Sequence, residues 1–192
     1  ERLAELNIDQ VPIAAASLGQ AHRATSQAGE RLCMKIRYPG VDEAIDSDIR
    51  TIARLLSLSL LVPKGLSLDP VLTEVREMLH REVDYVHEQD MLTAFHNKLA
   101  ADDRFVVPRP WARYSSSEVL TMSFEKGHSL KDPAVKALSP ERRQRLGTGL
   151  LWLFLQEFFV WHLVQTDPHF GNYRLRLDEA DGHDAWVLLD FG

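Results

Sequence analysis

The sequence predicts an α+β fold with two lobes, and three observations support this prediction. Runs of β-forming residues occur in both halves of the chain, at 31–37 and at 185–189. Long segments with apolar residues at helical spacing lie between them. The proline cluster Pro108-Arg109-Pro110 marks a turn where the chain changes character. With 192 residues, 45% of them hydrophobic, the chain can bury one good core or two small lobes.

The first lobe is expected to span residues 1–124 and to begin with a hairpin. A stretch rich in Ala, Ser and Gly, residues 14–20, precedes the run Arg-Leu-Cys-Met-Lys-Ile-Arg at 31–37. This run is typical of a strand, and it ends at Tyr38-Pro39-Gly40. Residues 11–37 therefore resemble a β-hairpin.

Two helices are expected after the hairpin. The first runs from Val41 to about Leu61 and the second from Asp69 to about Leu99, where Asp69 and Pro70 resemble a cap and a first-turn residue. Proline and glycine in residues 62–65 separate the two helices. The first helix has apolar residues at helical spacing, namely Ile45, Ile49, Ile52 and Leu56.

The second lobe is expected to span residues 125–192. The alternating run at 118–124 is rich in β-formers and ends at Glu125-Lys126-Gly127, which has the character of a hinge. A long helix is expected to start at Ser139-Pro140-Glu141. The remaining expected features are the end of that helix at about Val164, a loop at 167–172, and strands at 173–177 and 185–189.

Composition and charge argue against several functions. A net charge of −6 without a basic cluster argues against nucleic-acid binding. The single cysteine, Cys33, excludes an internal disulfide framework and a cysteine-rich zinc site, and it fits a reducing compartment. The scattered histidines lack the spacing of zinc ligands, so we assign no zinc. The most apolar stretch, 149–164, is interrupted by polar residues and is shorter than the roughly 20 residues of a spanning helix, so we expect a buried helix there.

Several residues match the requirements of phosphoryl transfer from ATP, which needs a phosphate cover, a cation, metal ligands and a carboxylate near the attacking oxygen. Lys35 lies in the strand after the alanine-rich turn, and a helix carboxylate such as Glu82 is placed to pair with it. Asp167 and Asn172 have the separation of base and metal-binding Asn in kinase catalytic loops, and Asp190-Phe191-Gly192 follows. A lone strand lysine is usually a surface residue and Asp-Phe-Gly is often a plain turn, so the joint order is the specific signal.

Five motifs follow one another along nearly the whole chain. The first is residues 12–20, with the sequence PIAAASLGQ. The others are Met34-Lys35-Ile36 followed by Tyr38-Pro39-Gly40, then Glu82-Val83-Asp84-Tyr85 with Glu88 beyond, then residues 166–172 (TDPHFGN), and finally Leu188-Leu189-Asp190-Phe191-Gly192. In this order they resemble the motifs of the UbiB (AarF-type) atypical kinases, a protein-kinase-like family associated with ubiquinone biosynthesis.

The resemblance implies a protein-kinase-like two-lobed fold, with a sheet and helices in the first lobe and a partial helical second lobe truncated at Asp-Phe-Gly. It implies that Lys35 contacts the α and β phosphates of ATP and pairs with Glu82. Asn172 and Asp190 would hold Mg²⁺, and Asp167 would take the catalytic-base position. The residues expected to bind the nucleotide are Ala14, Ala15, Ala16, Ser17, Gly19, Gln20, Lys35 and Glu82.

Three functions are open at this stage. The first is a Mg²⁺-dependent ATPase or atypical kinase that binds ATP or ADP and supports ubiquinone biosynthesis inside the cell, in the cytoplasm or peripherally at the inner membrane. Its expected partners are lipid or quinone intermediates and biosynthetic enzymes. The second is a pseudokinase-like scaffold or chaperone switched by nucleotide occupancy. The third is a small-molecule kinase of the aminoglycoside or choline type, against which the alanine-rich loop and the Glu-x-Asp motif argue.

The resemblance also implies parts that these residues do not include. The family has an N-terminal extension with a Lys-x-Gly-Gln motif that packs over the active site, and its C-terminal lobe continues beyond Asp-Phe-Gly. We therefore expect the chain to be a piece of a longer protein.

Overall fold

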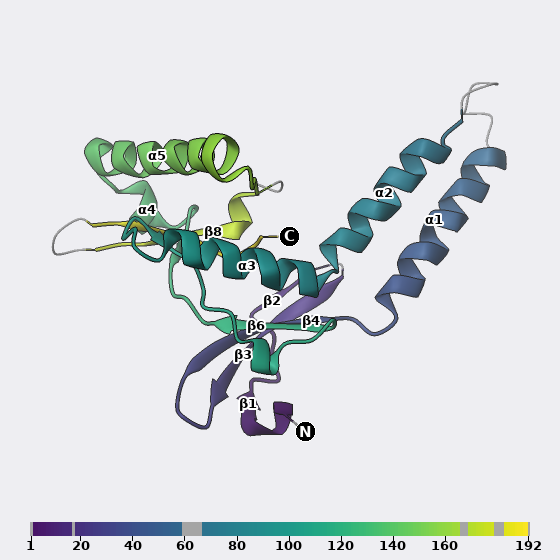
Figure 1. Cartoon of the computed structure of the whole chain (residues 1–192), viewed down its shortest axis with the longest axis horizontal. Helices are drawn as coiled ribbons and strands as arrows, with labels where there is room; N and C mark the ends of the chain where they lie inside the picture. The colour runs from purple at the N-terminus through teal and green to yellow at the C-terminus, as the bar shows by residue number, and fades with distance from the viewer. Residues whose placement is uncertain (1, 17, 59–66, 166–168, 179–182, 192) are drawn as a thin grey trace.

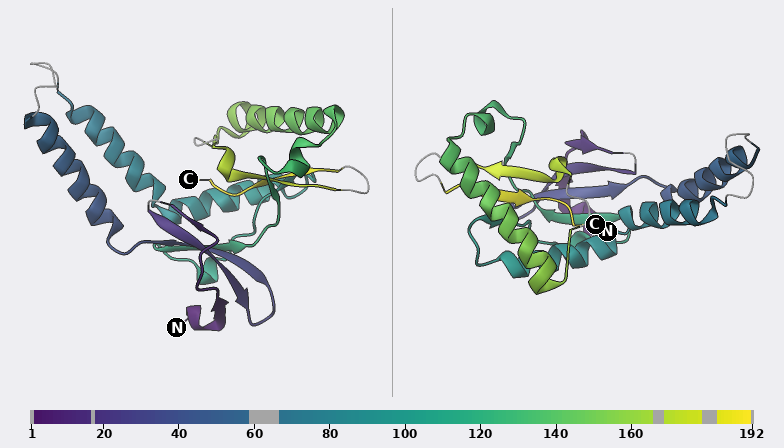
Figure 2. Two further views of the ribbon diagram at one scale, coloured as in Figure 1. Left: turned by 180° about the vertical axis from the view of Figure 1, so that it is seen from behind. Right: turned by 90° about the horizontal axis from the view of Figure 1, so that it is seen from above.

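Two β-sheets with helices around them organise the part of the chain that the computed structural model describes (Figure 1). That part comprises all residues except 1, 17, 59–66, 166–168, 179–182 and 192. Helix α3 (Tyr85–Leu99) crosses the molecule between the two sheets, and helix α5 (Pro140–Leu155) lies on the far side of the smaller sheet (Figures 1 and 2). The elements of both expected lobes therefore meet at α3.

The larger sheet has five strands, all antiparallel to their neighbours. They are β1 (Leu6–Ile8), β2 (Ala14–Ala15), β3 (Gly19–Ser26), β4 (Arg31–Arg37) and β6 (Val119–Ser123). Their order is β1-β3-β4-β6, and β2 pairs with β3 beside β1. Alternate residues of β4 face the core, where Leu32 and Met34 are fully buried. The strand expected at 31–37 is confirmed at both ends, as is the hairpin that contains it.

Helices α1 (Val41–Leu58) and α2 (Asp69–Glu82) form a hairpin that projects away from both sheets (Figure 1). The start of α1 confirms the expected start at Val41. A small apolar cluster of Val41, Ile45 and Val83 holds the base of the hairpin. Every residue of α2 is at least partly exposed, so the hairpin depends on this base for its attachment.

The single helix expected over 69–99 is wrong, because the chain breaks at Val83 and Asp84 and starts a new helix. The Asp84 side chain accepts a hydrogen bond from the backbone N–H of His87 at 3.0 Å and so caps α3. This cap satisfies one of the N–H groups that a helix start leaves unpaired, which allows α3 to take a new direction. As a result α3 packs against the sheets and buries Leu92 and Phe95.

The smaller sheet has four strands in the order β5-β9-β8-β7. They are β5 (Phe105–Val106), β7 (His128–Ser129), β8 (Tyr173–Arg176) and β9 (Ala185–Leu188). β5 runs parallel to β9, and the other pairs are antiparallel. The strands expected at 173–177 and 185–189 are confirmed to within one residue. β5 belongs to the second sheet, although it lies before residue 124, where the first lobe was expected to end. The boundary between the two lobes stays a prediction.

The long helix expected to reach about Val164 ends earlier. Ser139 caps α5, since its hydroxyl accepts a hydrogen bond from the backbone N–H of Arg142 at 3.3 Å. After Leu155 the backbone forms a π-helical turn over Gln156–Trp161, and His162 ends it with a left-handed φ of 50°. The short elements not yet named are α4 (Pro133–Lys136) and the 3₁₀ turns Arg2–Glu5, Ala112–Tyr114 and Phe170–Asn172. Within the described ranges, none of the helices combines the length and apolar character that crossing a bilayer requires.

A partly buried ion pair fastens α5 to the segment before β9. The guanidinium of Arg142 donates from Nε to the carboxylate of Asp184 at 2.7 Å, and its Nη2 forms a second bond to the same carboxylate. The Asp184 side chain is only 3% exposed. Its hydrogen bonds with Arg142 hold the pKa of the Asp184 carboxyl below its usual value.

We expect Asp184→Asn to lower the free energy of unfolding at pH 7 by about 1.5–3 kcal/mol, because charge-assisted hydrogen bonds are lost. The pKa of Asp184 is lower in the folded state than in the unfolded chain. The carboxylate therefore stabilises the fold above the unfolded-state pKa of about 3.9, and this contribution is lost as the pH falls through the folded-state pKa. The difference in free energy of unfolding by urea between the variant and the wild type should begin to shrink below about pH 4 and should vanish below the folded-state pKa. The exposed Asp48→Asn is the control, and a difference that stays constant with pH would contradict the assignment.

Candidate active site

Three charged side chains from three different elements meet at Lys35. Lys35 lies on β4 and forms an ion pair with Glu88, which lies on α3. Its Nζ also lies 3.2 Å from the carboxylate of Asp190, which follows β9. The Glu88 side chain is 6% exposed, that of Lys35 20% and that of Asp190 38%, so the group is open to solvent on the Asp190 side. The sequence-based candidates Lys35 and Asp190 are thus brought together.

Burial and the neighbouring charges shift the pKa values of Lys35 and Glu88 in opposite directions. Burial lowers the pKa of Lys35, but the carboxylates of Glu88 and Asp190 outweigh it and hold the pKa above its usual value, so Lys35 stays charged. Burial raises the pKa of Glu88 to about 7, against the attraction of Lys35. Two carboxylates outnumber the one ammonium group, so the site carries excess negative charge when both are ionised. A bound metal cation would balance that charge.

The partner of Lys35 is Glu88, and the expected pairing with Glu82 is wrong. Glu82 is the exposed last residue of α2, just before the break that starts α3. Glu88 lies in the first turn of α3 and belongs to the buried stripe of that helix, which consists of Tyr85, Glu88, Leu92, Phe95 and Leu99. A glutamate within an apolar stripe at helical spacing is the sequence signal that identifies Glu88.

The alanine-rich stretch forms a hairpin directly beside Lys35. Ala14 pairs with Ala21, and Ala21 also pairs with Lys35 on the other side of β3. The neighbouring pair is Ala15 with Gln20, and the backbone N–H of Ala16 donates to the carbonyl of Gly19 at 2.9 Å. The three alanines of the motif are exposed. Ser17 lies outside the described residues.

Gly19 is required where the hairpin approaches β4 and α3. A Cβ atom at this position would lie 2.6 Å from the carbonyl oxygen of Ile36 and 3.0 Å from the hydroxyl of Tyr85. The first contact is with backbone, which cannot move aside without disturbing the ladder between β3 and β4. The absence of a side chain at Gly19 therefore allows the hairpin to lie against the strand that carries Lys35.

Phe191 connects the Asp-Phe-Gly segment to α3. Its ring is 4% exposed and lies 4.8 Å from the ring of Phe95, measured between centroids. Burial of this ring beneath α3 places the preceding residue, Asp190, beside Lys35. Gly192 lies outside the described residues.

Gln165, which sequence reasoning missed, ties the backbone of Asp190 to Glu157, the second residue of the π-helical turn. Its side-chain amide donates to the carbonyl of Asp190 and accepts from the hydroxyl of Tyr173 at 2.8 Å. Its own N–H donates to the buried carboxylate of Glu157 at 3.2 Å, and burial raises the pKa of Glu157. None of these residues carries a local signal, because their contacts join segments far apart in the sequence.

The backbone of Asn172 is hydrogen-bonded to the residue that precedes Asp190. The carbonyl of Asn172 accepts from the N–H of Leu189 at 2.9 Å, at the end of the ladder between β8 and β9. Amide and carboxylate oxygens are the donors that Mg²⁺ prefers, and the donor set therefore fits this ion. Asp167 lies outside the described residues, so its expected role as catalytic base stays a prediction.

Comparison with protein families gives one match over most of the chain. The profile described as the ABC1 atypical kinase-like domain matches residues 6–192. Atypical kinase COQ8, mitochondrial, of Saccharomyces cerevisiae is 36% identical over 186 residues, which are 96% of this chain and 36% of the yeast protein. Atypical kinase COQ8B, mitochondrial, of Danio rerio is 37% identical over 186 residues, 97% of this chain and 29% of that protein. The chain thus spans about a third of the length of these relatives.

Comparison with solved structures gives the same type of fold. The complex of Rv3197 with erythromycin from Mycobacterium tuberculosis is 29% identical and has a TM-score of 0.76, covering 96% of this chain and 45% of that one. The Rio2 kinase–ADP/Mg²⁺–phosphoaspartate complex from Chaetomium thermophilum is 18% identical, with a TM-score of 0.58 over 96% of this chain and 47% of that one. These findings confirm the predicted α+β, protein-kinase-like fold and the resemblance read from the five motifs.

Proposed function

This chain belongs to the family of ABC1 atypical kinase-like domains, and from that premise we propose that it binds ATP with Mg²⁺ beside Lys35 and transfers or hydrolyses the terminal phosphate. The observation that carries the proposal is the placement of Lys35 between Glu88 and Asp190. A cation held by two carboxylates, one of them open to solvent, is suited to phosphate binding next to a metal ion.

Each residue has a specific task in this proposal. The ammonium group of Lys35 binds the α and β phosphates, and Glu88 keeps it oriented from α3. Asn172 and Asp190 hold Mg²⁺, which neutralises phosphate charge when it is bound. Asp167, in the catalytic-base position of its motif, orients the attacking water or hydroxyl group. The alanine-rich hairpin, residues 14–20, covers the nucleotide.

The wider role follows from the family resemblance. We propose that the activity supports ubiquinone biosynthesis and that lipid or quinone intermediates and biosynthetic enzymes are its partners. The two relatives are named as mitochondrial proteins. For this chain we propose a location inside the cell, in the cytoplasm or at the surface of the inner membrane.

The first test is Mg²⁺-dependent nucleotide binding by the full-length protein, measured as thermal stabilisation by ATP and by ADP. Ligand at 100 times its Kd stabilises a protein by about 2.7 kcal/mol, which raises its Tm. We expect this rise in the wild type and its loss in Lys35→Ala, in Asp190→Asn and on chelation of Mg²⁺. Lys136→Ala, an exposed lysine at the end of α4, is the matched control. No rise in the wild type would refute the proposal.

Phosphate release distinguishes the enzyme from the scaffold. We expect Mg²⁺-dependent turnover in the wild type that Asp190→Asn abolishes. Stabilisation by nucleotide without any turnover would instead favour the nucleotide-switched scaffold or chaperone.

A further inference from the structure

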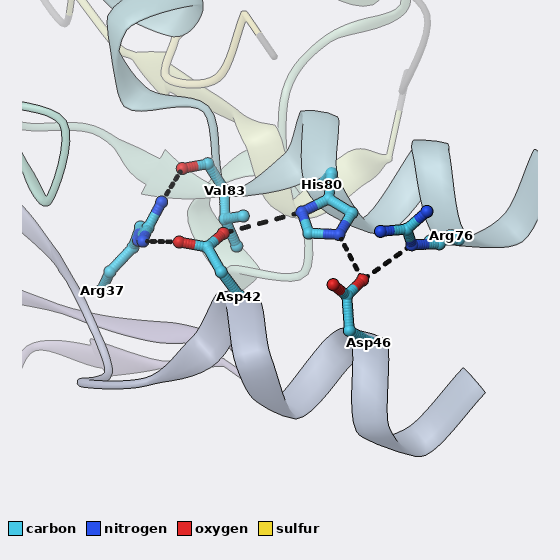
Figure 3. Close-up of polar contacts among 6 residues, drawn as sticks. All are labelled: Arg37, Asp42, Asp46, Arg76, His80 and Val83. Carbon is cyan, nitrogen blue, oxygen red and sulfur yellow. Dashed lines mark hydrogen bonds and ion pairs between the residues drawn. The ribbon is translucent and has the colours of Figure 1, made fainter. Parts of the chain in front are cut away.

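Arg37 lies two residues after Lys35 on β4, so the two side chains point to the same face of the sheet. The Arg37 side chain is 14% exposed. Its Nη1 donates to the carbonyl of Val83 at 3.0 Å, and its Nη2 donates to the carboxylate of Asp42 at 2.5 Å (Figure 3). One guanidinium group thus joins the strand that carries Lys35 to the starts of α1 and α3.

The contacts of Lys35 and Arg37 form two parallel connections between β4 and α3. Val83 immediately precedes the capping residue of α3, whereas Glu88 lies in the first turn of that helix. Two residues along a strand span about 7 Å. The two side chains therefore attach successive points on one face of β4 to Val83, before α3 begins, and to Glu88, within α3. A positive charge at the Val83 carbonyl also suits the C-terminal end of α2.

A polar network continues from Arg37 into the helical hairpin (Figure 3). Asp42 lies 3.6 Å from Nδ1 of His80, and Nε2 of His80 contacts Asp46 at 3.0 Å. Arg76 donates from Nε to Asp46 at 2.7 Å. Within this network Arg37 is the member that lies on the strand of Lys35, while the others belong to α1 and α2.

We propose that Arg37 is a positioning residue: it fixes the start of α3 against β4 and thereby sets where Glu88 meets Lys35. The inference rests on the proposed nucleotide function, because the position of Lys35 matters for phosphate chemistry. The Nε of Arg37 is buried and has no hydrogen-bond partner among the described residues. One of the three guanidinium nitrogens therefore makes no hydrogen bond, while the two terminal nitrogens connect β4 to Asp42 and Val83.

The test compares three variants of the full-length protein. Arg37→Met keeps most of the length of the side chain and removes both donors. Arg37→Lys keeps the charge and a donor, but it lacks the planar fork that reaches two acceptors at once. Arg76→Met is the matched control, since it removes an arginine from the same network at an exposed ion pair with Asp46. Loss of Arg37 leaves the Val83 carbonyl bonded to the N–H of Tyr85 and leaves Asp42 half exposed to water, so the variants are expected to fold.

Two readouts separate positioning from stability. The first is the steady-state rate of ATP hydrolysis, where we expect Arg37→Met to lower kcat by about 10- to 100-fold and to change KM less than about 3-fold, as for a misplaced catalytic group. The second is hydrogen exchange of the amides of residues 85–92 without nucleotide, which should become about 10-fold faster. Arg37→Lys should lie between the wild type and Arg37→Met in both, and Arg76→Met should match the wild type.

Wild-type kcat and wild-type exchange in Arg37→Met would overturn the proposal. Equal effects of Arg37→Met and Arg76→Met would also overturn it, because they would reflect general loosening of the hairpin. Absence of nucleotide binding and turnover in the wild type would refute the proposed function instead. In that case the exchange of residues 85–92 still decides whether Arg37 positions α3.

Discussion

Replacing Glu88 with Gln lowers kcat/KM for ATP hydrolysis by at least about 100-fold, because an uncharged amide cannot hold the Lys35 ammonium in place. In the structure Glu88 is the buried partner of Lys35, and Asp190 is the exposed one. Without Glu88 the ammonium group would be drawn towards Asp190, which the proposed mechanism needs for Mg²⁺. Turnover should therefore fall even at saturating ATP.

The same substitution at Glu82 tests which glutamate is the partner of Lys35: Glu88, as in the structure, or Glu82, as expected from the sequence. Glu82 is exposed at the end of α2, so Glu82→Gln is expected to change kcat/KM by less than about 2-fold. Phosphate release by both variants, each checked for its thermal melting point, gives the comparison. A large loss in Glu82→Gln with normal turnover in Glu88→Gln would refute the assignment of Glu88.

Replacing Leu120 with Ala lowers the free energy of unfolding by about 2–5 kcal/mol, the range for removing a buried leucine side chain. Leu120 is fully buried on β6, belongs to the core cluster that includes Phe95 and Trp186, and pairs with Lys35 across the sheet. The cavity would thus form beneath the strand that carries the site. For a chain of this size the Tm should fall by roughly 5–15 °C.

Urea unfolding measures this loss, and Leu55→Ala is its control. Leu55 on α1 is 63% exposed, so its replacement should change the free energy of unfolding by no more than about 0.5 kcal/mol. If Leu120→Ala were as mild as the control, the Leu120 side chain would not lie in the core.

Elements with strong local signals could be predicted from the sequence. The strand at 31–37 alternates and ends at a Pro-Gly turn, and the start of α5 has a serine cap followed by proline. The break between α2 and α3 could not be predicted, because Glu82-Val83-Asp84 contains neither a proline nor a glycine to mark it. Asp84 acts as a cap only because α3 gains burial by turning towards the sheets. The two-residue strand β5 has no periodicity to detect, since its parallel pairing with β9 depends on the finished fold.

Some residues of the candidate site could likewise be predicted from the sequence, and others could not. The order of the motifs was enough to predict that Lys35 and Asp190 belong to one site, because each is a residue type that phosphate chemistry requires. The partner of Lys35 was misassigned because two glutamates lie six residues apart, and only the direction of α3 decides which of them faces β4. Gln165 was missed because its contacts with Asp190 and Tyr173 are long-range.

The ring contact between Phe95 and Phe191 couples the two carboxylates that hold Lys35. Glu88 lies two turns before Phe95 on α3, and Asp190 immediately precedes Phe191. A tilt of α3 would withdraw Glu88 and at the same time uncover the ring that keeps Asp190 in place. We therefore expect Glu88 and Asp190 to move into or out of place together. A partner that binds α3 would then change the positions of both carboxylates at once.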